Sequence, residues 1–129
     1  MEKKYDYKQL EVYKESKILV KMVYTLMRKF PQYEQYALCD QLRRAVISVP
    51  SNIAEGSGRY STKEQVHFLE IAYGSLREVD CQLDIACDLE YLHPSELENV
   101  AVQIRRISAL LSGLRSKHLS ESSPNSLIP

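Results

Sequence analysis

The sequence predicts an all-α protein, an up-down-up-down antiparallel four-helix bundle whose second helix is kinked at Pro50. The chain has 129 residues, enough to enclose one hydrophobic core and too few for two. Apolar residues recur at helical spacing in four stretches that proline or glycine separates, and no alternating stretch indicates a strand. Short connections make neighbouring helices antiparallel, which gives the up-down order.

The first helix is predicted over residues 9–29, which contain neither glycine nor proline, and Pro31 follows as a breaker. Two apolar rows run along this stretch. One row holds Val12, Leu19, Val23, Leu26 and Phe30, and the other holds Leu10, Tyr13, Val20, Tyr24 and Met27. One row is enough to pack a helix in a monomeric bundle, so the second row indicates contacts with another subunit.

The second helix is predicted to begin with Glu34 in its first turn and to end at Gly56 and Gly58. Its core face holds Leu38, Leu42, Ala45, Val49 and Ile53. This face continues in phase through Pro50, which removes one backbone hydrogen bond and costs about 3 kcal/mol unless neighbours compensate. We therefore predict a kink at Pro50 and not a helix end.

The third helix is predicted from a capping box at Ser61 and Glu64 to Leu92, a span of about 45 Å. Its apolar arc is wide: one row holds Val66, Leu69, Tyr73, Leu76, Leu83 and Cys87, and a second beside it holds Phe68, Ala72, Val79, Ala86 and Leu89. The third helix is therefore a second candidate for subunit contacts. The fourth helix is predicted from a capping box at Ser95 and Glu98. Its core row has alternating steps of three and four and holds Leu97, Val100, Ile104, Ile107, Leu111 and Leu114.

The domain organisation that follows is one bundle over residues 1–118 and a flexible polar tail over residues 119–129. No apolar run reaches the roughly 18 to 20 residues that span a bilayer. The three cysteines form no CxxC pair, which favours reduced, buried thiols. We expect a cytoplasmic protein that is neither exported nor inserted in a membrane.

Charge is balanced overall, with 17 basic and 17 acidic residues, and gives no preference for a partner. Its distribution is uneven. Residues 1–30 hold eight basic and four acidic residues, whereas residues 65–92 hold one basic and six acidic residues. Such asymmetry suits pairing of helices, pairing of subunits, or attraction of an anionic ligand.

Catalytic and metal motifs are weak in this sequence. Glu64 and His67 form an ExxH motif, and Glu90 and His93 form another, 26 residues further along the same predicted helix. That separation corresponds to about 39 Å, so the two motifs cannot share a metal. No nucleophile elbow or phosphate loop occurs. We expect no enzyme, metal or cofactor; a small-molecule or metal-dependent enzyme with its site in the bundle core remains the alternative.

Basic residues gather around the second helix and its exit, and they are the candidates for nucleic-acid binding. Two interpretations stand. The cations form salt links with Glu55, Glu70, Glu78 or Asp80, or several subunits combine them into a phosphate-binding patch. Glu55 stands at the favourable four-residue spacing from Arg59. Tyr60, beside Arg59, is the candidate for base stacking. The full candidate set is Arg43, Arg44, Arg59, Tyr60, Lys63 and Arg77.

Three runs of the sequence resemble one protein family. They are Leu-Glu-Val-Tyr at residues 10–13, the run at 35–59 that contains Ser-Asn-Ile-Ala-Glu-Gly, and Glu-Gln-Val-His-Phe-Leu-Glu-Ile-Ala-Tyr-Gly-Ser-Leu-Arg-Glu at 64–78. The similarity covers about residues 7–112. The family comprises bacterial four-helix-bundle proteins named after open reading frames in the intervening sequences of 23S ribosomal RNA genes.

The resemblance implies a ring-like homopentamer. It also implies kinship with the accessory variability proteins of diversity-generating retroelements, which are similar in fold and bind a reverse transcriptase and nucleic acid. By that analogy Arg43, Arg44 and Arg59 are candidates for an RNA or DNA surface. Those proteins are markedly basic, whereas this chain is neutral. The expectation is a non-enzymatic homo-oligomeric adaptor, with RNA or a nucleic-acid enzyme as its candidate partner.

Overall fold

A computed structural model describes residues 6–122 of the chain. In this part it contains four α-helices, three short 3-10 segments and no strand, which confirms the predicted all-α, four-helix class. The helices are α1 (Glu11–Met27), α2 (Leu38–Ser57), α3 (Thr62–Asp88) and α4 (Glu98–Ser122), and the 3-10 segments are η1 (Tyr7–Gln9), η2 (Gln32–Glu34) and η3 (Pro94–Leu97).

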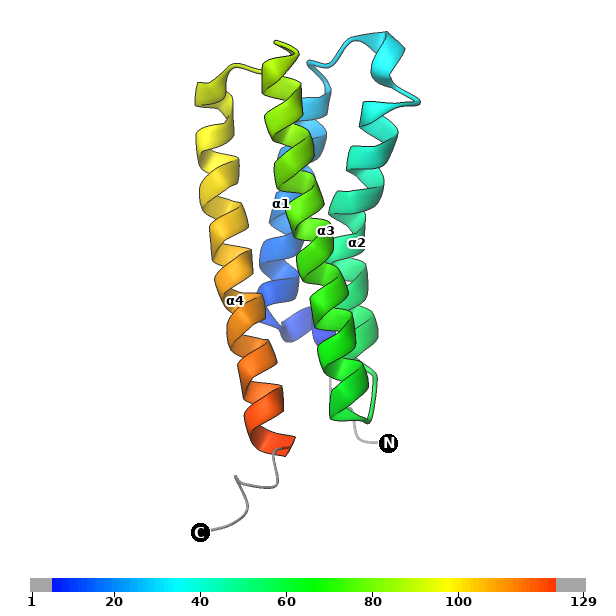
Figure 1. The fold of residues 1–129 in the computed structure, drawn as a ribbon, viewed down its shortest axis with the longest axis vertical. Helices are drawn as coiled ribbons and strands as arrows, with labels where there is room; N and C mark the ends of the chain where they lie inside the picture. Colours follow the sequence, from blue (N-terminus) through cyan, green and yellow to red (C-terminus); the bar gives the residue numbers. More distant parts are fainter. Residues whose placement is uncertain (1–5, 123–129) are drawn as a thin grey trace.

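The four helices lie side by side along one axis (Figure 1). The connections that contain η2 and η3 lie at one end of the molecule, and the α2–α3 connection lies at the other end, near the start of α1 and the end of α4. Each helix contacts its neighbours in the order α1, α2, α3, α4 and back to α1, and the α2–α3 contact is the most extensive. As a result, α1 and α3 occupy diagonal positions.

The core takes side chains from all four helices, and those from α2 and α4 include the rows that the sequence predicts. Leu42, Val49 and Ile53 are fully buried in α2, as are Ile107 and Leu111 in α4. α2 runs without interruption through Pro50, which is buried inside it. The kink predicted there stays a prediction.

The two apolar rows of α1 differ in how deeply they are buried. Val12, Leu19 and Val23 face the core, and Ser16, which interrupts this row, is buried with its hydroxyl donating to the Val12 carbonyl at 2.7 Å. The other row is only partly covered, and Tyr24 remains 39% exposed. A surplus apolar surface therefore exists on α1 within a single subunit.

The rows predicted for α3 are mostly covered by α2 and α4, apart from Tyr73 and Leu89. α3 also exposes apolar residues that do not belong to the predicted rows. Ile71 is 37% exposed and Ile85 is 42% exposed, on the outward side of the helix. The predicted rows of α3 therefore leave only Tyr73 and Leu89 exposed, and Ile71 and Ile85 add apolar surface outside those rows.

Two predicted helix ends need correction. α2 begins at Leu38 and not near Glu34, because residues 32–34 form η2. The Glu34 carboxylate instead accepts hydrogen bonds from the Leu38 backbone N–H at 3.2 Å and from the Tyr91 hydroxyl at 2.6 Å. It thereby links the start of α2 to the segment that follows α3.

α3 ends at Asp88 and not at Leu92, because Glu90 adopts a left-handed conformation with φ of 65°. The Glu90 N–H donates to the Cys87 carbonyl and the Tyr91 N–H donates to the Ala86 carbonyl, both at 2.9 Å. These two bonds form a Schellman motif, which usually has glycine at this position. No glycine marks the end in the sequence, so the pattern could not reveal it.

Of the two predicted N-caps, the one at Ser61 is confirmed and the one at Ser95 is wrong. Ser61 caps α3, and its hydroxyl accepts from the Glu64 N–H at 3.0 Å. The second capping box belongs to His93 and not to Ser95: the His93 ring accepts from the Ser95 N–H at 3.1 Å, and the Glu96 carboxylate accepts from the His93 N–H at 2.7 Å. Pro94, which suits a first helical position, places the cap on the residue before it.

The boundary of the predicted tail also moves. α4 continues to Ser122, so residues 119–122 are helical. The last turns of α4 lie at the bundle end. There Lys117, His118 and Glu121 line a cavity together with residues of α2 and α3. Residues 123–129 of the predicted tail lie outside the described residues.

The three cysteines are free thiols in different surroundings. Cys39 is buried, Cys87 is half-buried and Cys81 is exposed, so the expectation of buried thiols is wrong for Cys81. Burial raises the pKa of Cys39 and of Cys87, which disfavours the reactive thiolate form. Within residues 6–122, no helix is both long and apolar enough to cross a membrane.

The α2–α3 contact is close because short side chains lie between the two helices. The Ser48 and Ser75 hydroxyls are 2.8 Å apart, and the Asn52 side chain donates to the Ser48 carbonyl at 2.9 Å. A Cβ placed on Gly56 would lie only 2.9 Å from the Cβ of Phe68. The glycine is therefore required by packing, in addition to marking the end of the helix.

Replacing Gly56 by alanine should lower the free energy of unfolding by about 1–3 kcal/mol, because the added methyl group forces α2 and α3 apart. Gly113→Ala is the matched control, since an added Cβ there meets nothing within 4 Å. It should raise the free energy of unfolding by about 0.5–1 kcal/mol. Urea unfolding followed by circular dichroism measures both, and equal stabilisation of the two variants would contradict the close contact.

Glu90→Gly should raise the free energy of unfolding by about 0.5–1 kcal/mol, because glycine adopts the left-handed conformation without the steric cost that glutamate bears. Ala109→Gly, at an exposed helical position of α4, should lower it by a similar amount. The same unfolding measurement compares them. A destabilised Glu90→Gly variant would mean that the glutamate side chain makes a compensating contact.

Candidate nucleic-acid interface

The six candidate residues lie in three places and not in one patch. Arg43 and Arg44 lie in the first half of α2, the Arg59, Tyr60 and Lys63 group lies at the α2–α3 connection, and Arg77 lies in the middle of α3. Arg43 and Arg59 are 16 positions apart along the same helix and its cap, a distance of about 24 Å. A single subunit therefore does not bring all six together.

Arg43 and Arg44 are both engaged with Asp40, one turn earlier in α2. Arg44 lies 3.1 Å from one carboxylate oxygen and Arg43 lies 3.6 Å from the other. Arg43 also donates to the Gln35 carbonyl at 3.0 Å, which ties it to the preceding connection. Asp40 was not among the predicted partners. Arg44, whose side chain is 80% exposed, is the more accessible of the two cations.

The α2–α3 connection presents a tyrosine between two cations. Arg59 pairs with Glu55, as the four-residue spacing suggests, and its guanidinium lies 4.9 Å from the centre of the Phe68 ring. Tyr60 is fully exposed and Lys63 is exposed. No ion pair involves Lys63 among the described residues. This connection therefore offers a ligand an aromatic face, together with the Lys63 ammonium in the first turn of α3.

Arg77 lies beside Tyr73, which lines a groove between α3 and α4. Hydrogen bonds with Ser108 and with Arg77 lower the pKa of the Tyr73 hydroxyl. Further along the groove, Arg115 donates to the Glu70 carboxylate at 2.9 Å. Glu70 was a predicted partner for the candidate cations, but it binds Arg115. Among the described residues, Arg77 forms no ion pair with Glu78 or Asp80, and the residue that it influences is Tyr73.

A basic row on α1 was not among the candidates. Lys14, Lys17, Lys21 and Arg28 are exposed on this helix, and no ion pair joins them to a carboxylate within residues 6–122. The excess positive charge of residues 1–30 was visible in the sequence. Its steps of three, four and seven, which place the four cations on one side of a helix, were the signal that could have identified the row.

Beside this row lies an apolar groove of about 430 Å³ between α1 and α2. Its floor includes Val20, Ile47 and Pro50, and Lys17 and Lys21 lie at its edge. The Tyr7 and Tyr13 rings meet edge to face at 5.0 Å at one end of it. The surplus row of α1 and the exposed apolar residue of α2, Ile47, therefore form one continuous surface.

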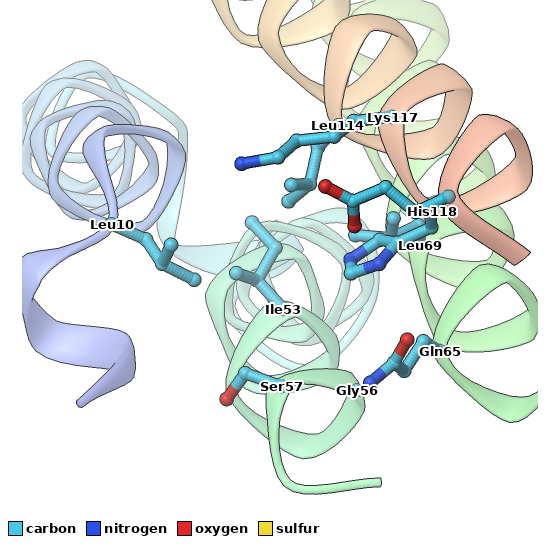
Figure 2. A pocket seen from close by; sticks show the side chains of 10 residues that line it. Leu10, Ile53, Gly56, Ser57, Gln65, Leu69, Leu114, Lys117 and His118 are labelled. Atoms are coloured by element: carbon cyan, nitrogen blue, oxygen red, sulfur yellow. The ribbon is translucent and has the colours of Figure 1, made fainter. Parts of the chain in front are cut away.

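A second hollow of about 300 Å³ lies at the bundle end that carries the α2–α3 connection. Figure 2 shows side chains from α2, α3, α4 and the start of α1 pointing into it. Its residues are Leu10, Ile53, Gly56, Ser57, Gln65, Leu69, Leu114, Lys117, His118 and Glu121. We call it the end cavity.

The two ExxH motifs do not converge. His67 is exposed and its ring lies 5.6 Å from that of Phe68, whereas His93 caps η3 at the opposite end of the bundle. In the part of the chain that the structure describes, no group of three or more His, Cys, Asp and Glu side chains is placed to hold a metal ion.

Comparison with known proteins identifies the family. A family model described as 23S rRNA-intervening sequence protein matches residues 8–113. The chain belongs to this family. The resemblance noted in the sequence is thereby confirmed. A search of curated proteins finds no match to the chain. All six candidate residues lie inside the region that defines a 23S rRNA-intervening sequence protein, whereas Leu114, Lys117, His118 and Glu121 of the end cavity lie beyond it.

Proposed function

We propose that the chain is a non-enzymatic, cytoplasmic, homo-oligomeric adaptor that binds RNA, with five copies arranged in a ring. The subunit in this proposal is the predicted up-down-up-down antiparallel bundle, with α2 kinked at Pro50. The observation that carries the proposal is the apolar α1–α2 groove, edged by lysines that no carboxylate of residues 6–122 pairs.

The groove needs a covering partner on energetic grounds. Ile47 is 41% exposed and Tyr24 is 39% exposed, and both adjoin the half-buried Val20. Burying apolar surface stabilises an association by roughly 25 cal/mol per Å². Lysines at the edge of such a groove favour a partner that carries carboxylates.

A second copy carries a matching surface on α3. Its outward row has alternating steps of three and four and consists of Ile71, Gly74, Glu78, Cys81, Ile85 and Asp88, all exposed. Ile71 and Ile85 supply apolar contacts, Gly74 and Cys81 are small enough to let a neighbour approach, and Glu78 and Asp88 supply negative charge. This row fits an apolar groove whose edge is basic.

The two surfaces lie on diagonal helices of the bundle, so α1 of one copy meets α3 of the next. Such a contact joins two different surfaces, and repetition of it produces a ring when the rotation closes. The number of five rests on the resemblance to ring-forming relatives and not on this geometry.

Reversing the charge on one surface should separate the subunits. Lys17→Glu/Lys21→Glu and, separately, Glu78→Lys/Asp88→Lys should each reduce the mass measured by light scattering toward that of the 14.9 kDa chain. The four changes combined should restore the oligomer, because the charges are complementary again. Arg105→Glu, on the exposed side of α4, is the control and should change nothing. A wild-type mass near 15 kDa at micromolar concentration would end the proposal of an oligomer.

RNA binding is proposed at the α2–α3 connection. A closed ring places every copy of Arg59, Tyr60 and Lys63 on the same rim. Tyr60 offers a stacking surface, and Lys63 has no carboxylate partner among the described residues. A single-stranded RNA suits this arrangement, since its unpaired bases are free to stack on aromatic side chains.

Tyr60→Ala/Lys63→Glu should weaken binding of a single-stranded RNA by at least tenfold, because it removes a stacking contact worth about 1–3 kcal/mol and reverses a charge. Fluorescence anisotropy at low salt measures this, with Arg105→Glu as a control of equal charge change. Unchanged affinity would remove the connection from the site. Arg43→Glu/Arg44→Glu tests the other candidate place, where Asp40 already offsets both cations, and should have a smaller effect.

A further inference from the structure

We propose that the end cavity of each subunit binds one unpaired nucleobase of the RNA strand. The inference rests on the proposed RNA binding and adds where a base is recognised. Flipped bases are held in other proteins between apolar side chains, with polar groups along the base edge. The end cavity combines these two features.

The walls of the cavity are apolar and come from all four helices or their caps. Leu10, Ile53, Leu69 and Leu114 surround the space (Figure 2). Its volume of about 300 Å³ lies at the lower end of the range for small-molecule sites. A single flat ring system suits this size, and apolar walls suit its faces.

One polar group of the cavity is held rigidly. The Gln65 side chain is only 8% exposed, and its Nε2 donates to the Arg59 carbonyl at 2.7 Å. This bond fixes the plane of the amide. A fixed amide at the wall of an apolar cavity is suited to hydrogen-bond the edge of a base.

The mouth of the cavity favours a neutral ring over an anion. Lys117 and Glu121 lie there together, one turn apart on α4, and their charges cancel. His118 contributes a half-buried ring that can donate or accept. A phosphate or a fatty-acid carboxylate would meet Glu121 unfavourably, whereas a base edge with both donors and acceptors meets groups of both kinds.

Position and overall charge support the same assignment. Gln65 connects the cavity directly to Arg59, so a strand lying on Arg59, Tyr60 and Lys63 passes close to the cavity. The chain has no net charge, so phosphate contacts alone offer limited affinity. Burying a base supplies affinity that does not depend on net charge.

The test combines nuclear magnetic resonance with anisotropy on the full chain. Adenosine, guanosine, cytidine and uridine are added separately, and at least one should shift the side-chain amide signals of Gln65. Leu114→Trp fills the cavity and should abolish that shift and weaken single-stranded RNA binding about tenfold. Val102→Trp adds the same ring to an exposed position of α4 and should leave both unchanged. Glu121→Ala, an exposed change that should not affect folding, removes one acceptor for the base edge and should reduce the nucleoside-induced shift of Gln65 several-fold.

The outcomes separate the two proposals. If wild-type protein binds RNA, no nucleoside shifts Gln65, and Leu114→Trp binds RNA as tightly as wild type, then the cavity assignment is wrong and the RNA function stands. If wild type binds no RNA at low salt, the proposed function falls and this inference falls with it. Should Leu114→Trp fail to fold, as judged by circular dichroism, the Glu121→Ala result and the nucleoside shifts decide the matter.

Discussion

The close approach of α2 and α3 is the contact on which the rest of the molecule depends. Gly56 leaves space for the Cβ of Phe68, and the Ser48 and Ser75 hydroxyls meet at 2.8 Å between the two backbones. The connection between the two helices is short. Because the helices pack closely on both sides of it, its residues are held in place. Gln65 can then reach the Arg59 carbonyl, which joins the exposed connection to the end cavity.

The other helix pairs pack less extensively, and this leaves surface that a single subunit does not cover. Lysines edge the α1–α2 groove, whereas the outward row of α3, the helix diagonal to α1, carries Glu78 and Asp88. The zero net charge of the whole chain does not reveal this separation of positive from negative charge. In the proposed function, this separation of charge lets a chain with no net charge bind its own copies through electrostatic complementarity and offer local positive charge to RNA.

The candidate site shows how far sequence reasoning reaches. The candidate cations lie near one another along the chain, which is a property of the sequence. Helical spacing also predicts the pairing of Arg59 with Glu55. The pairing of Asp40 with Arg44 has the same four-residue spacing and its pairing with Arg43 has a three-residue spacing, yet neither pair was predicted. The end cavity was not predictable, because its lining residues come from positions 10 to 121 and share no local pattern.

The sequence by itself determined that the chain is helical, where its four helices lie and which rows of α2 and α4 form the core. Apolar periodicity and the Ser61 cap are properties of a single segment, so they can be read without knowing its neighbours. Only the tertiary structure decided that α3 ends at the left-handed Glu90, that Gly56 is required by Phe68, and which apolar rows stay uncovered. These features depend on contacts between segments far apart in the chain, and such contacts leave no periodic signal in either segment.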